Sequence, residues 1–113
     1  MISRKLTLVA ALAAIVVLVV AAGASGRAKT TVDVGDDFFD PKKVKIDKKD
    51  TIKFNWIGVN EHDIVKIKGP GKFFESGPIT GSGIEYKRKF TKAGDYKLIC
   101  TLHEKMTMKV EVD

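Results

Sequence analysis

The segment GDYKLICTLHEKMTMKVEV, residues 94–112, carries both the strand pattern and the candidate chemistry of this 113-residue chain. Its soft and apolar side chains recur at every second position on either side of the loop TLHEK. The residues in phase are Tyr96, Leu98, Cys100, Met106, Met108, Val110 and Val112. Successive side chains of a β-strand point to opposite faces, so this alternation predicts two half-buried strands joined by a short loop.

The same period of two continues through most of the chain. It is found in KVKIDK, TIKFNWIG, DIVKIKG and IEYKRKF, and in DIVKIKG it places Val65 and Ile67 on one face. Segments rich in turn-forming residues separate these runs, among them FDPKK, DKKDT, KGPGK and TKAGD. Short strands at these intervals, without a convincing amphipathic helix, predict an all-β sandwich with one core. Residues 70–83, rich in glycine and proline, are interpreted as a long surface connection.

The N-terminal part has the pattern of an export signal. Two basic residues precede an uncharged run from position 6 to 24, which ends in small residues, so residues 1–24 are predicted to be a signal peptide. The run is also nearly long enough to span a bilayer, and an uncleaved membrane anchor is the alternative. Residues 25–31 are interpreted as a linker and residues 32–113 as the domain. On either interpretation the domain works outside the cytoplasm, in the periplasm or on the outer face of the cytoplasmic membrane.

Four residues form a candidate metal site. Cys100 is the only cysteine of the chain, which is unusual in an exported protein, where cysteines generally pair. His103 and Met106 follow it by three and six positions, and His62 lies about 40 residues upstream. A thiolate, two imidazoles and a distant thioether are the donors of mononuclear blue copper. Each residue alone is weak support, because buried methionines and single histidines are common, but the joint spacing predicts a copper site.

The chain resembles the cupredoxins, the small blue copper proteins that include plastocyanin and amicyanin. FFDPKKVKIDKKDTIKFNW is similar to the opening strands of that family, and NEHDI falls where its first histidine ligand is expected. FTKAGDYKLICTLHEKMTMKVEV is similar to the closing pattern F-x-x-x-G-x-Y-x-Y-x-C-x-x-H-x-x-M, followed by a V-x-V strand. The resemblance covers nearly the whole mature chain, and it implies a Greek-key β-sandwich of the cupredoxin type.

The resemblance also implies one copper ion held by His62, Cys100, His103 and a methionine. Met106 is the predicted fourth ligand, because the last strand of short-loop members begins four residues after the methionine, where this chain has Val110. Met108, the alternative, would then be a core residue of that strand. The implied function is one-electron transfer between Cu(II) and Cu(I), without catalysis, by a monomer that meets its redox partners weakly and transiently.

Two residues depart from the family pattern. Asp63 stands where asparagine commonly follows the first histidine, and it can accept a hydrogen bond from the Thr101 hydroxyl or from a backbone N–H. Leu102 stands where proline is common, beside the ring of His103 through which electrons are expected to leave. Together with Gly58 and Val59 it is expected to form an apolar docking patch.

The net charge of +6 is spread over scattered lysines, as on solvated strand faces, and disfavours a nucleic-acid-binding role in an exported chain. A mildly basic face would favour an acidic redox partner. The nearest alternative function is copper storage or delivery by the same fold. More distant alternatives are a cysteine hydrolase built on Cys100, His62 and Asp63, and a metal-free adhesion sandwich. A binuclear copper centre would need a second cysteine, and a multicopper oxidase would need more than two histidines.

Overall fold

The structure, a computed structural model, describes residues 30–113, which form ten β-strands and no helix. The strands are β1 (Thr30–Gly35), β2 (Phe38–Asp40), β3 (Lys43–Ile46), β4 (Thr51–Trp56), β5 (Glu61–His62), β6 (Val65–Lys68), β7 (Ile79–Thr80), β8 (Glu85–Lys89), β9 (Gly94–Ile99) and β10 (Thr107–Val112). Among these residues no helix is long and apolar enough to cross a membrane. The predicted signal peptide or anchor lies outside the described residues. Thr30 and Thr31, which lie in the predicted linker, pair with β4.

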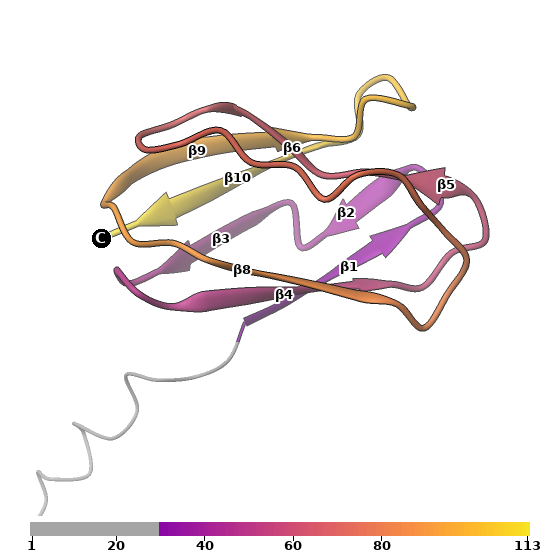
Figure 1. The fold of residues 1–113 in the computed structure, drawn as a ribbon, viewed down its shortest axis with the longest axis horizontal. Helices are drawn as coiled ribbons and strands as arrows, with labels where there is room; N and C mark the ends of the chain where they lie inside the picture. The colour runs from indigo at the N-terminus through magenta and orange to yellow at the C-terminus, as the bar shows by residue number, and fades with distance from the viewer. Residues whose placement is uncertain (1–29) are drawn as a thin grey trace, which may run out of the picture.

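Two four-stranded sheets face each other and form the predicted β-sandwich (Figure 1). One sheet has the strand order β2-β1-β4-β8 and the other β3-β10-β9-β6, while β5 and β7 form a separate two-stranded sheet. The chain changes sheet between β2 and β3 and between β3 and β4. It crosses again from β4 by way of β5 to β6, from β6 by way of β7 to β8, and between β8 and β9. These crossings make β1 parallel to β4 and β10 parallel to β3, whereas the other pairs are antiparallel. The predicted all-β sandwich is therefore confirmed.

The core consists of the inward-facing residues of both sheets. β4 contributes Ile52, Phe54 and Trp56, each without solvent exposure, as the alternation of TIKFNW predicts. The seven side chains that are in phase in residues 94–112 are all buried, none more than 5% exposed. The strand prediction for this segment is confirmed, because a period of two places every second side chain in the core.

The prediction for β6 is wrong by one position. Val65 is buried as expected, but Ile67 is 47% exposed and Lys66 between them is only 7% exposed. The register between β6 and β9 shifts between Lys66 and Lys68, and such an irregularity changes which side chains face inward. Alternation within the strand sequence does not predict this register shift, because the shift depends on the pairing with β9.

Lys66 is buried together with three hydrogen-bond acceptors. Its Nζ donates to the carbonyl oxygens of Pro70 at 2.6 Å, Gly71 at 3.0 Å and Lys72 at 3.0 Å. Burial lowers the pKa of Lys66, and the charge of Arg88 acts in the same direction. The three carbonyls supply the partners that a buried ammonium group needs, so this lysine closes the loop after β6.

The segment 70–83 is more than the surface connection that the sequence suggested. Phe74 is 6% exposed and its ring meets that of Phe90 edge to face, with centroids 5.7 Å apart. Ser76 and Ile64 exchange two hydrogen bonds of 2.9 Å, and β7 pairs with β5. The segment therefore packs along β5 and β6 and contributes to the core.

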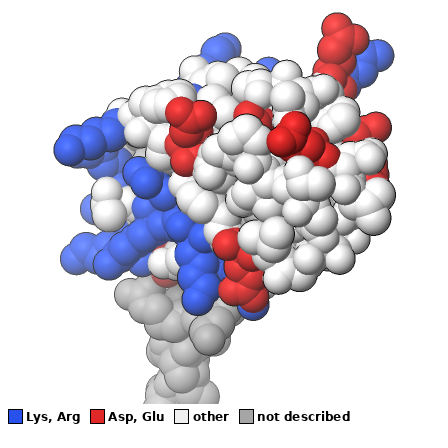
Figure 2. All heavy atoms as spheres, turned by 45° about the vertical axis from the view of Figure 1, so that its right-hand side comes forward, with Lys and Arg blue, Asp and Glu red and all other residues white. Residues whose placement is uncertain are grey.

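Charged side chains are distributed unevenly over the described surface. Figure 2 shows most of the lysine and arginine side chains on one side, and acidic side chains among uncharged ones on the side that carries β5 in Figure 1. At this end the connections 36–37, 57–60 and 101–105 contain a single basic residue, Lys105. Asp37, Glu61 and Glu104 are exposed in or beside them. This end is acidic although the whole chain is basic.

Candidate metal centre

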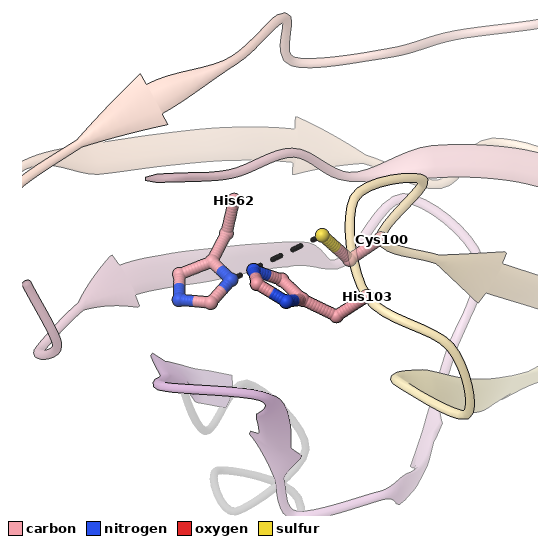
Figure 3. Close-up of side chains that lie close together, drawn as sticks. All are labelled: His62, Cys100 and His103. Carbon is pink, nitrogen blue, oxygen red and sulfur yellow. Dashed lines mark hydrogen bonds between the residues drawn. The ribbon is translucent and has the colours of Figure 1, made fainter. Parts of the chain in front are cut away.

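Three predicted ligands meet at one end of the sandwich (Figure 3). His62 ends β5, Cys100 directly follows β9, and His103 lies in the loop between β9 and β10. One donor atom of each residue lies within 4.8 Å of the others. His62 and Cys100 are buried, with 0% and 3% exposure, whereas the side chain of His103 is 26% exposed.

Strand pairing brings these residues together over a long stretch of chain. Val65 of β6 pairs with Ile99 of β9, so the segment that follows His62 runs beside the segment that ends at Cys100. Thr107 of β10 pairs with Ile99 from the other side. The two edges of β9 therefore position the upstream histidine and the closing loop at the same point.

Met106 lies directly across the closing loop from Cys100. The Cys100 N–H donates a 3.0 Å hydrogen bond to the carbonyl oxygen of Met106, and both residues line a surface pocket together with His103. Met108 pairs with Leu98 inside the core and does not line that pocket. Both methionines are buried, at 1% and 2% exposure, so position and not burial distinguishes them. His62 does not line this pocket, so the choice of Met106 over Met108 as a ligand stays a prediction.

His62 has a different neighbour at each ring nitrogen. Its Nδ1 lies 4.0 Å from Cys100 Sγ, and its Nε2 lies 3.0 Å from Asp36 Oδ1. The contact with His62, with help from the backbone N–H groups of Asn60 and Val59, lowers the pKa of Asp36 to about 2. Asp36 was not predicted from the sequence. Its only local signal is the acidic pair DD, which does not reveal a distant histidine.

The neighbouring acid contacts the second histidine. Asp37 Oδ1 lies 3.1 Å from His103 Nδ1, and the carbonyl oxygen of Glu61 lies 3.1 Å from His103 Nε2. Asp37 has a φ of 77°, a left-handed conformation that tightens the turn between β1 and β2. Two adjacent carboxylates of one turn therefore reach the two histidines of the cluster. Because both ring nitrogens of His103 face acceptors, a metal ion bound by His103 has to replace one of these two contacts.

Asp63 connects the two segments that carry the cluster. The Thr101 N–H donates to Asp63 Oδ1 at 2.7 Å, and the Thr101 hydroxyl donates to Oδ2 at 2.6 Å. The Asp63 N–H in turn points at Cys100 Sγ, at 3.5 Å. The sequence predicted a bond from the Thr101 hydroxyl or a backbone N–H, and both are present. A carboxylate therefore performs the tie for which the family commonly uses asparagine.

The donor set and its spacing fit one copper ion. Metal–nitrogen and metal–sulfur bonds in proteins are about 2.0 to 2.3 Å long, so two donors of one ion lie at most about 4.4 Å apart. The 4.0 Å between His62 Nδ1 and Cys100 Sγ meets this limit. The bound of 4.8 Å for all three donor atoms is slightly wider, so the cluster has to contract a little around one ion. Burial raises the pKa of the Cys100 thiol, so metal binding has to displace its proton. A buried thiolate with two imidazoles suits a soft or borderline metal such as copper.

Known proteins match this chain in both sequence and fold. The family model described as copper binding proteins of the plastocyanin/azurin family matches residues 26–113. A comparison with curated protein sequences finds no match. Among solved structures, a purple cupredoxin from Nitrosopumilus maritimus is 22% identical with a TM-score of 0.66, covering 75% of this chain and 100% of that one.

Two further structures show how the domain relates to single-domain and larger proteins. A mutant of amicyanin, in its reduced Cu(I) form, is 21% identical with a TM-score of 0.67, covering 81% of this chain and 89% of that one. A copper-containing nitrite reductase from Thermus scotoductus SA-01 is 28% identical with a TM-score of 0.65, covering 76% of this chain. The present chain spans only 22% of that reductase.

The tie between Asp63 and Thr101 gives a test of what holds the two segments together. We expect Asp63→Ala to lower the free energy of unfolding of the metal-free protein by about 1–3 kcal/mol, because two donors lose their acceptor. Asp63→Asn should lose less, since its amide can accept from the N–H and donate to the Thr101 hydroxyl oxygen. Urea denaturation measures both. Equal losses in the two variants would contradict the proposed role of these hydrogen bonds.

Proposed function

The chain belongs to the plastocyanin/azurin family of copper-binding proteins, and from this premise we propose that it carries single electrons outside the cytoplasm as a type 1 copper protein. The observation that carries the proposal is the convergence of His62, Cys100 and His103 from distant segments. The sandwich and its copper cofactor are family properties. The electron-carrier role and the location outside the cytoplasm go beyond family membership and are proposed.

In this proposal His62, Cys100 and His103 hold the ion strongly and Met106 holds it weakly. Bound copper supplies the Cu(II)/Cu(I) couple. The protein contributes ligand positions that need not move when the charge changes. Cys100 is fixed by its backbone hydrogen bond to Met106, and the tie from Asp63 to Thr101 restrains the loop that follows it. A rigid donor set suits electron transfer.

His103 is the proposed exit for the electron, because it is the partly exposed member of the cluster. Near it lies Leu102, which is 46% exposed, and the loop that contacts Asp36 presents Val59 at 72% exposure. Gly58, expected in the same apolar patch, is instead buried under this loop. A small apolar surface of this kind suits the short-lived encounters of redox proteins.

The charge around His103 argues for a basic partner. The sequence suggested a basic face and therefore an acidic partner, but Asp37 contacts His103, the Glu61 carbonyl oxygen lies 3.1 Å from its ring, and the exposed Glu104 follows it in the chain. The lysines that make the chain basic lie mainly elsewhere on the surface. Complementary charge steers diffusional encounters, so we propose a redox partner whose docking surface is basic.

The first prediction concerns the copper complex. Adding Cu(II) to the purified protein should produce an intense visible band, because charge passes from the Cys100 thiolate to the metal. Cys100→Ser should abolish that band, since a hydroxyl does not replace the thiolate. Visible absorption and paramagnetic resonance measure the effect. A colourless or merely pale wild-type complex would overturn the proposal.

The second prediction compares the two methionines. Met106→Leu should change the visible spectrum and the reduction potential, because it removes the proposed weak ligand. Met108→Leu, the matched control, should leave both unchanged and alter stability by less than about 1.5 kcal/mol, as for a volume-conserving core substitution. Spectra, voltammetry and urea denaturation separate the effects. Reversed results would show that Met108 faces the copper.

The third prediction tests electron carriage and partner charge together. The reduced copper protein should pass its electron to a basic redox protein, such as a lysine-rich cytochrome, at a rate that falls as ionic strength rises. Glu104→Lys should slow this reaction at low salt. Glu111→Lys, on β10 and away from the cluster, should affect it less. A rate that is insensitive to salt and to Glu104→Lys would contradict docking at the acidic end.

A further inference from the structure

The ring of His62 is held between the metal cluster and a carboxylate. It is fully buried, its Nδ1 lies 4.0 Å from Cys100 Sγ, and its Nε2 lies 3.0 Å from Asp36 Oδ1. An imidazole that ligates through one nitrogen commonly donates its other N–H to a carboxylate or a carbonyl. Here the available acceptor is the carboxylate of Asp36.

The position of Asp36 is itself held by a dedicated loop. The Val59 N–H lies 3.1 Å from both carboxylate oxygens, and the Asn60 N–H donates to Oδ1 at 2.9 Å. A Cβ atom built on Gly58 would overlap the Asp36 carboxylate. The loop therefore holds the carboxylate with backbone donors and leaves room for it at Gly58, while the Asp36 side chain remains 36% exposed.

We propose that Asp36 is a positioning residue, which keeps the His62 proton on Nε2 and so leaves the Nδ1 lone pair facing the copper. An ionised carboxylate can only accept a hydrogen bond, so the nitrogen beside it must carry the proton. Nδ1 then remains unprotonated, as a metal ligand must be. This inference rests on the proposed copper site and adds to it the residue that prepares one ligand before metal binds.

The Asp36 carboxylate should also influence the reduction potential electrostatically. It places a negative charge on the far side of the His62 ring from the metal position, where it favours the more highly charged Cu(II) state over Cu(I). Asp36 therefore lowers the reduction potential. With its proton on Nε2 alone the histidine is neutral, so the contact is a hydrogen bond to a charged acceptor and not an ion pair; the ring is fully buried and the carboxylate is 36% exposed.

The sharpest test uses the metal-free protein, so that copper chemistry does not enter. Nitrogen-15 NMR of the His62 ring should show a single Nε2–H tautomer in the wild type. In Asp36→Ala a measurable fraction should change to the Nδ1–H form, and Cu(II) affinity should fall about 10–100-fold. Gly58→Ala keeps the charge but displaces the carboxylate, so it should produce the same change of tautomer. Amide spectra verify that each variant is folded.

A second measurement separates charge from position. In the copper-loaded protein, Asp36→Asn should raise the reduction potential. Asp33→Asn removes the same charge three residues earlier, on β1 just before the turn that carries Asp36, and should leave the potential nearly unchanged. Equal shifts in both variants would overturn the electrical role of Asp36.

The outcomes for Asp36 and for the proposed function are distinguishable. A single Nε2–H tautomer that persists in Asp36→Ala and in Gly58→Ala would overturn the inference, since the backbone alone would then orient His62. A wild-type protein without the charge-transfer band would overturn the proposed function instead. The tautomer measurement does not depend on that band.

Discussion

The candidate site depends on the pairing of β9 with a neighbour along each of its edges. β6 on one edge brings the segment that follows His62, and β10 on the other brings Met106 opposite Cys100. Because ladder hydrogen bonds fix register, a slip of one residue would turn Cys100 from the inner face to the outer face. The burial of Tyr96 and Leu98 in the core holds that register.

The strands bring the ligand residues close together, and polar contacts then orient their side chains. Asp63 joins the histidine segment to the cysteine loop, and the turn between β1 and β2 sends Asp36 to His62 and Asp37 to His103. These carboxylates belong to the acidic end of the molecule. The same carboxylates would therefore orient the histidine ligands and attract a basic partner. A substitution in this turn is expected to affect both ligand orientation and partner binding.

The sequence alone predicted the strands well where alternation is undisturbed and poorly where a long-range contact intervenes. Residues 94–112 followed their pattern at every in-phase position. Ile67 did not, because the irregular pairing of β6 with β9 turns it outward and Lys66 inward. The glycine-rich segment 70–83 concealed Phe74, a core residue whose packing depends on Phe90. Its neighbours are distant in the chain, so no local period indicates its burial.

The sequence by itself determined the strand alternation, the donor types and the short spacing of Cys100, His103 and Met106, because these depend on neighbours within a few residues. It also supplied the family resemblance that selected His62. Only the tertiary structure brought the acidic turn at Asp36 to that histidine and gathered acidic side chains at one end of a basic chain. Those features depend on which distant segments the sheets bring together. Local sequence patterns do not predict such contacts, because they reflect only neighbours within a few residues.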